Sequence, residues 1–148
     1  MNWIMKKIMT ILASVLFIVP FVYADDKVFE FNKLPLAAKE FVLKYFPEDQ
    51  VMLTTVDDDM VRPDYEVVLK SGAKMTFEHN GTLDKVEVRT GAVPAGVVPQ
   101  QIETYVKSNY PDSQILEYEI GKKEYEVKLS NRIELTFNSA FKLVGIDD

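Results

Sequence analysis

Residues 34–47 read LPLAAKEFVLKYFP, and a related stretch, VPQQIETYVKSNYP, occupies residues 98–111, 64 positions later. In both, apolar residues recur at three- and four-residue spacing, which is typical of a helix with one buried stripe. Pro35 and Pro99 suit the first helical position, and Pro47 and Pro111 stop a helix. The sequence therefore predicts two related amphipathic helices and an internal repeat.

After each helix the apolar period changes to two, which indicates half-buried antiparallel strands. Residues 65–69, YEVVL, correspond to residues 125–129, YEVKL, at an offset of 60, so the first copy contains a four-residue insertion between Val56 and Asp64. Ser71-Gly72 and Asn80-Gly81 suit tight hairpin turns, whereas Ala140-Phe141 in place of Asn-Gly predicts a wider or differently shaped turn. The predicted strands cover residues 50–55, 65–70, 74–79, 85–89 and 114–119, followed by three more that end at Ile146.

These elements predict an α+β fold, a tandem repeat of one helix plus a four-stranded antiparallel sheet. The first repeat would cover residues 25–90 and the second residues 99–148. Residues 91–98, which are rich in Gly, Ala and Pro, would link them.

One helix covers only one face of a four-stranded sheet, so the opposite face of each repeat should be open and polar. If the two sheets join edge to edge, their twist would make this face shallow and concave. We predict that it binds a partner, and the candidate residues are Glu66, Lys70, Thr76, Glu78, Glu126, Lys128, Glu134 and Thr136.

Residues 1–24 have the features of a signal peptide. Lys6 and Lys7 precede an almost wholly apolar run over 8–22, and Val22-Tyr23-Ala24 offers a cleavage site. The alternative, an uncleaved anchor, is disfavoured because a membrane span needs about 20 apolar residues. The protein is therefore expected to be periplasmic or secreted, with no stable membrane insertion after cleavage.

The composition narrows the possible chemistry. The chain has no cysteine, which excludes lipidation, disulfides and thiolate metal sites. Its formal net charge of −6 becomes −8 once Lys6 and Lys7 are removed, and such a charge opposes binding to nucleic acid and suits a basic partner.

The catalytic motifs that we sought do not occur in the sequence. His79 is the only histidine and is expected to flank the Asn80-Gly81 turn. A single imidazole cannot build a typical zinc site or nucleophilic triad, and no Gly-x-Ser-x-Gly or phosphate-binding glycine loop occurs. We therefore expect a protein that is not an enzyme and that uses no cofactor.

Asp57, Asp58 and Asp59 form the one local acidic run and lie in the four-residue insertion. Carboxylates in a loop can bind calcium, but the run lacks the glycine and glutamate of an EF-hand. A solvated loop, a calcium site and a finger that contacts a partner are the three interpretations.

The pattern of Leu-Pro, a helix ending in Tyr-Phe-Pro, Tyr-Glu-Val-x-Leu, a strand ending in Phe, and Asn-Gly resembles the PepSY-like, beta-lactamase-inhibitor-like domain family of exported Bacteroidetes proteins. The resemblance covers nearly all of the chain after residue 24 and implies a tandem α+β fold similar to the beta-lactamase inhibitor protein. It further implies a concave sheet face that can hold a protein. The second copy departs from the pattern at Asn109 and Ala140-Phe141, so equal binding by both repeats does not follow.

Two functions remain. The favoured hypothesis is a non-catalytic binding module of the cell envelope, an inhibitor of or adaptor for an exported protein or peptide, with tyrosines and charged residues of the open face as anchors. The alternative is a periplasmic protein that binds a small ligand or calcium through the acidic loop. A cluster of aromatic residues on the open face would favour the first, and a deep pocket with converging carboxylates the second.

Overall fold

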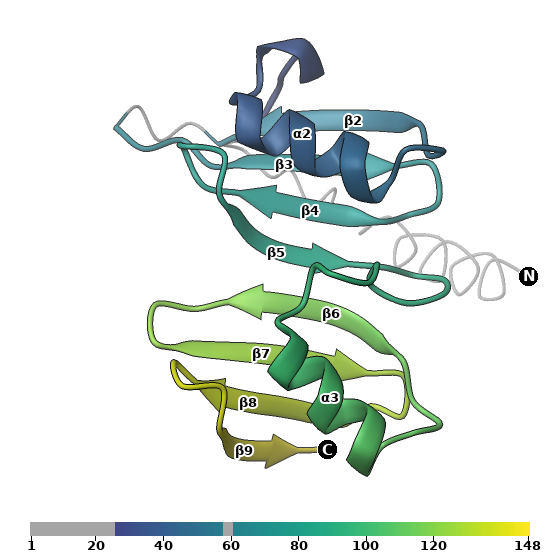
Figure 1. Cartoon of the computed structure of the whole chain (residues 1–148). Coiled ribbons are helices and arrows are strands. Elements are labelled where there is room, and N and C mark those ends of the chain that lie inside the picture. Colours follow the sequence, from purple (N-terminus) through teal and green to yellow (C-terminus); the bar gives the residue numbers. More distant parts are fainter. Residues whose placement is uncertain (1–25, 58–60) are drawn as a thin grey trace, which may run out of the picture.

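The computed structural model describes residues 26–57 and 61–148 (Figure 1). The predicted signal peptide, residues 1–24, and two of the three loop aspartates, Asp58 and Asp59, lie outside these residues. The first elements in chain order are β1 (Lys27–Val28), a 3-10 helix (Phe31–Lys33), α2 (Leu36–Tyr45), β2 (Val51–Val56), β3 (Tyr65–Leu69), β4 (Lys74–Phe77) and β5 (Leu83–Glu87). They are followed by α3 (Gln100–Asn109), β6 (Ile115–Ile120), β7 (Glu124–Leu129), β8 (Glu134–Asn138) and β9 (Leu143–Asp147).

Both helices form where the sequence predicts them. Each begins one residue after its proline, so Pro35 and Pro99 occupy the N-cap rather than the predicted first helical position. In α2 the side chains of Ala38 and Val42 are buried, and α3 buries Ile102 and Val106, again four residues apart. This spacing directs one stripe of each helix onto the sheet.

The nine strands form one antiparallel sheet in which spatial order follows chain order. The first half of the sheet, β1 to β5, joins the second half, β6 to β9, edge to edge, because β5 pairs with β6. In this pairing Lys85 lies opposite Glu119, Val86 opposite Tyr118 and Glu87 opposite Glu117. Both helices lie on the same face of the sheet, α2 over the first half and α3 over the second (Figure 1). The α+β fold class is thus confirmed, with two α-helices and a nine-stranded antiparallel sheet across residues 26–57 and 61–148. The short strand β1 was not predicted.

The core lies between the helices and this face. T-shaped aromatic contacts connect the layers in both halves: the rings of Phe41 and Phe77 are 5.7 Å apart between centroids, and those of Tyr105 and Phe137 are 5.5 Å apart. One row of side chains on this face runs across the sheet from β2 to β9, each residue opposite the next. Its members are Thr54, Val67, Met75, Val86, Tyr118, Val127, Leu135 and Ile146.

The turn at Ala140-Phe141 corrects one prediction. Phe141 donates its N–H to the carbonyl oxygen of Asn138 at 2.9 Å, as Gly81 does to Glu78 at 2.8 Å, so the turn is neither wider nor differently closed. Both residues have a left-handed backbone, with φ of 59° at Phe141 and 87° at Gly81. Phe141 occupies this conformation while its ring stacks on Tyr125, with centroids 5.1 Å apart.

Candidate functional site: the open face of the sheet

The face of the sheet opposite the helices presents two parallel rows of side chains, which the pairing of the strands defines. The first, the Thr76 row, consists of Thr55, Glu66, Thr76, Lys85, Glu119, Glu126, Thr136 and Gly145. The second, the Lys74 row, consists of Leu53, Val68, Lys74, Glu87, Glu117, Lys128, Glu134 and Asp147. Because successive side chains of a strand alternate between faces, these rows are the surface that the helices leave uncovered.

Six of the eight predicted site residues lie in these rows: Glu66, Thr76, Glu126, Lys128, Glu134 and Thr136. The placement of Lys70 and Glu78 in strands is wrong, because β3 ends at Leu69 and β4 ends at Phe77. Both lie in turns at the strand ends. Lys70 donates its N–H to the Gln50 carbonyl oxygen, and Glu78 donates its N–H to the Thr82 carbonyl oxygen and so closes the turn that also contains His79.

Six charged residues of the open face were missed by the sequence analysis: Lys74, Lys85, Glu87, Glu117, Glu119 and Asp147. A signal for four of them is present in the sequence. Lys85-Val86-Glu87 and Glu117-Tyr118-Glu119 alternate charged and apolar residues, and this places the charges on one face of a strand. What the sequence does not give is that these two strands are neighbours.

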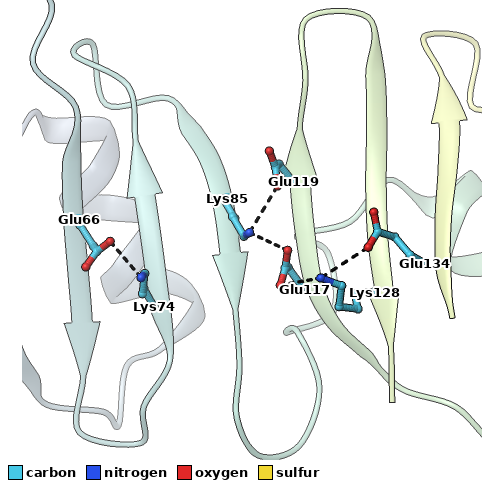
Figure 2. A network of polar contacts seen from close by, with 7 residues as sticks. All are labelled: Glu66, Lys74, Lys85, Glu117, Glu119, Lys128 and Glu134. Carbon is cyan, nitrogen blue, oxygen red and sulfur yellow. Dashed lines mark ion pairs between the residues drawn. The ribbon is translucent and has the colours of Figure 1, made fainter. Parts of the chain in front are cut away.

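Ion pairs cross the boundary between the two halves (Figure 2). Lys85 Nζ lies 2.7 Å from Glu117 Oε1 and 3.4 Å from Glu119 Oε2. On the other side of the same carboxylate, Lys128 Nζ lies 3.8 Å from Glu117 Oε2 and 3.5 Å from Glu134 Oε2. Glu117 is thus held between two lysines, and its side chain is only 16% exposed. The five residues form one network over β5 to β8.

A separate pair, in which Lys74 Nζ lies 3.2 Å from Glu66 Oε2, connects β4 with β3. The pKa of Lys85 reflects its position in the larger network. Burial acts to lower this pKa, but the hydrogen bond and the charge of Glu117, together with Glu119, outweigh burial and raise it above the ordinary value. Lys85 therefore stays charged as the cation at the centre of the face.

Negative charge exceeds positive charge in this region. From β5 to β8 the two rows carry five carboxylates, Glu87, Glu117, Glu119, Glu126 and Glu134, and two lysines, Lys85 and Lys128. Glu87 lies directly opposite Glu117, and Glu119 directly opposite Glu126. Burial, Glu134 and Glu119 raise the pKa of Glu126, in that order of importance. A basic group placed over this region would relieve these repulsions.

The outer end of the same face is apolar. Val28 of β1 lies opposite Thr55 and is 81% exposed, and Leu53 lies opposite Val68 and is 42% exposed. The strand tyrosines instead face the helices: Tyr65 lies opposite Phe77, and Tyr125 opposite Phe137. The expectation of tyrosine anchors on the open face is therefore wrong, because the alternation directs Glu66 and Glu126 to that face in their place.

The alternative site has little support within the described part of the chain. Across residues 26–57 and 61–148, no three His, Cys, Asp or Glu residues are grouped so that they could hold a metal ion. Asp57 Oδ1 accepts the N–H of Asp64 at 3.0 Å, so this carboxylate helps to close its own loop. A hollow of about 400 Å³ lies at the β6–β7 hairpin, and it is lined by Glu119, Gly121, Lys122, Lys123, Glu124 and Glu126.

In the described residues, two α-helices cover one face of a nine-stranded antiparallel sheet and leave the other face open. This arrangement defines the class of fold. Comparisons with known proteins then give the family. The family described as "Putative beta-lactamase-inhibitor-like, PepSY-like" matches residues 63–145, more than half of the chain. The chain belongs to this PepSY-like family. The comparison with curated proteins gave no significant match.

Solved structures of similar proteins come from Bacteroides. One, from Bacteroides thetaiotaomicron, is described as a "putative calcium-regulated periplasmic protein"; it is 37% identical, with a TM-score of 0.80 over 83% of this chain and 97% of that one. Another, from Bacteroides vulgatus, is described as a "putative periplasmic protein"; it is 37% identical, with a TM-score of 0.81 over 85% and 99%. A third, from the same species and of unknown function, is 30% identical, with a TM-score of 0.78 over 83% and 99%. Neither α-helix in the described part of the chain has the length and hydropathy to cross a membrane.

Proposed function

We propose that this protein is a non-catalytic binding module of the cell envelope, which holds an exported protein or peptide on the open face of its sheet as an inhibitor or adaptor. One observation carries the proposal: both helices cover one face, and no helix of residues 26–57 or 61–148 lies over the other face in either half. That face combines an apolar end with a network of net negative charge. An apolar area beside charged groups is the usual make-up of a protein-binding surface.

The periplasmic or secreted location rests on two supports. The similar Bacteroides structures are described as periplasmic proteins, and residues 1–24 have the features of a signal peptide. Such a location brings the open face into contact with exported proteins. The partner is a protein rather than nucleic acid, because the net charge of −6 opposes a polyphosphate.

We further infer that the chain is a tandem repeat, with a first repeat at residues 25–90, a linker at 91–98 and a second repeat at 99–148. Irregular positions of the backbone support this division. Register shifts occur between Val51 and Leu53 and between Ile115 and Glu117, 64 residues apart. Left-handed residues occur at Gly72 and Arg132 and at Gly81 and Phe141, 60 residues apart.

The proposal is tested by affinity capture from an envelope extract of the native host with the mature protein, residues 25–148. A double variant, Glu126→Lys with Glu134→Lys, reverses the charge at two positions of the open face. The matched control, Glu40→Lys with Glu48→Lys, reverses the charge of two exposed carboxylates outside that face. Both double variants change the net charge equally.

The expected result is a stoichiometric partner that the native protein and the control variant capture and the open-face variant loses. Capture should also weaken as salt is added, because screening reduces the attraction between charged surfaces. Equal capture by all three proteins, or equal loss in both variants, contradicts binding through the open face.

A second candidate function is calcium binding by the loop that contains Asp57, Asp58 and Asp59. It is favoured by the similar protein that is described as calcium-regulated. In this case calcium would raise the melting temperature of the mature protein, a chelator would reverse the effect, and Asp57→Asn with Asp59→Asn would abolish it. The variant Asp147→Asn with Asp148→Asn, which removes two carboxylates elsewhere, is the control.

A further inference from the structure

The row of core residues that crosses the sheet ends differently at its two sides. From Thr54 on β2 to Leu135 on β8, every member is at most 4% exposed. The last member, Ile146 on β9, lies opposite the fully buried Leu135 and is itself 55% exposed. The core thus continues to the outer edge of β9, where no strand of the described part of the chain covers it.

At the opposite side the chain closes the row with its own residues. Lys27 and Val28 of β1 pair with Val56 and Thr55, and Phe29 donates its N–H to the carbonyl oxygen of Thr54 at 2.8 Å. The Phe29 ring packs against Tyr65, with centroids 5.3 Å apart. An extended segment with an aromatic residue therefore covers the edge of β2.

The boundary between the halves repeats this arrangement. β6 runs antiparallel along the outer edge of β5 and places Tyr118 opposite Val86, and both side chains are buried. In the proposed tandem repeat β9 corresponds to β5, at an offset of 60, so Ile146 corresponds to Val86 and Asp147 to Glu87. The outer edge of β9 is the same edge without its covering strand among the described residues.

We propose that the outer edge of β9 is a second binding site, which receives an extended antiparallel segment of a partner protein. An aromatic residue of this segment would lie opposite Ile146, as Tyr118 lies opposite Val86. A lysine or arginine would lie opposite Asp147, where charge complementarity selects a basic side chain. Main-chain hydrogen bonds to the edge supply affinity, and these two positions supply specificity. This site does not depend on binding at the open face.

A second copy of the chain fits this edge less well than a basic partner. In an antiparallel pair of two β9 strands that overlap over residues 143–147, Leu143 rather than a basic side chain would lie opposite Asp147, and each chain has a net charge of −6. Charged residues on an edge strand are a common means by which proteins prevent such self-pairing. A segment with a lysine or arginine converts the same charges into attraction.

The chain itself supplies a probe peptide, because β6 already covers the corresponding edge. The probe is the capped heptapeptide of residues 114–120 with Glu117→Lys, whose tyrosine and lysine would face Ile146 and Asp147. It is titrated into isotope-labelled mature protein, and the backbone amide signals are followed by nuclear magnetic resonance. The expected result is saturable shifts at residues 143–148.

Two protein variants test the register. Ile146→Lys should weaken binding of the probe about fivefold or more, because it removes the apolar contact with the probe's tyrosine. Val144→Lys is the matched control, since Val144 is also 55% exposed on β9 but is the extra residue of the register shift and lies outside the core row. It should change the affinity less than twofold, and the amide spectra of both variants verify that they fold.

Several results would overturn the proposal. Shifts spread over the open face, absence of saturable shifts at 143–148, or equal weakening by both variants each exclude the β9 edge as the site. A dimer of the chain alone in sedimentation velocity at the same concentration would assign the edge to a second copy. Glu126→Lys alone reverses a carboxylate of the open face without changing a neighbour of Asp147, since Glu126 lies opposite Glu119 and Thr136. Probe binding to this single variant should therefore persist even if the open-face proposal fails.

Discussion

Arg132 and Gly72 occupy the same place in two turns that share their hydrogen bonds. Each donates its N–H to the residue three positions earlier, Leu129 or Leu69, at 3.0 and 2.9 Å. Both backbones are left-handed, with φ of 75° at Arg132 and 88° at Gly72. This conformation costs a residue with a Cβ atom about 1–2 kcal/mol, whereas glycine adopts it freely.

We therefore expect Arg132→Gly to stabilise the protein by about 0.5–1 kcal/mol, since relief of the left-handed strain exceeds the entropy that glycine loses on folding. Urea denaturation followed by circular dichroism measures the change. The opposite change in the first half, Gly72→Ala, should destabilise, because alanine is strained at a φ of 88° and its Cβ would also lie 2.7 Å from Arg89 Cδ, which would have to move. A loss of stability in Arg132→Gly would show that the arginine side chain contributes more than the strain costs.

At the scale of single elements, β7 carries an unfavourable pair of like charges, because Glu126 lies opposite Glu119 of β6. Burial and these neighbours raise the pKa of Glu126 above its ordinary value of 4.5. Between that value and the folded pKa, the folded chain binds a proton more readily than the unfolded chain does. Glu126 therefore lowers stability fully above the folded pKa, and the loss is recovered as the pH falls toward 4.5.

Glu126→Gln should consequently raise the free energy of unfolding near neutral pH by a few tenths of a kcal/mol, the size expected for one pair of like charges across strands. The gain over the native protein should shrink as the pH falls through the folded pKa. Thermal unfolding at a series of pH values measures both effects. Glu40→Gln on α2 removes one carboxylate away from the open face and is the control; an equal gain in this variant would contradict the explanation.

The elements differ in how far their sequence determines them. Both helices follow from residues 34–47 and 98–111, because proline and a single apolar stripe are strong local signals. The strand β1 could not be predicted, since it pairs over only two residues and has no period of its own. Lys70 and Glu78 were assigned to strands because period-two alternation does not indicate where a turn begins.

The candidate site could be predicted only in part, for a reason that concerns pairs of elements. Alternation within β3, β7 and β8 places Glu66, Glu126 and Glu134 on the open face. The ion pairs of Lys85 with Glu117 and Glu119 depend on the contact between β5 and β6. These two strands are separated in the sequence by α3, although they are neighbours in the sheet. Short-range patterns contain no information about which edges of two sheets meet.

At the scale of the whole molecule, the core row and the β5–β6 pairing connect the two halves. We expect one cooperative unfolding transition, because separation of the halves would expose Val86 and Tyr118, which are buried against each other. Residue-resolved denaturation by nuclear magnetic resonance should give the same midpoint for the amides of Val67 and Val127.

A variant at the boundary tests the same coupling. Val86→Ala should lower stability by about 2 kcal/mol and shift the midpoints of both halves together. Val28→Ala, at a side chain that is 81% exposed, is the control and should shift neither. Two separate midpoints in the native protein would mean that the halves fold independently despite their common sheet.

The segment at residues 27–29 has a consequence for stoichiometry. It forms one end of the sheet but pairs over only two residues, whereas β9 spans five residues at the other end. A strand added beside residues 27–28 would therefore gain far fewer main-chain hydrogen bonds than one added along β9. Strand addition is thus expected to favour one end of each molecule, which limits growth from chain to chain into a fibre.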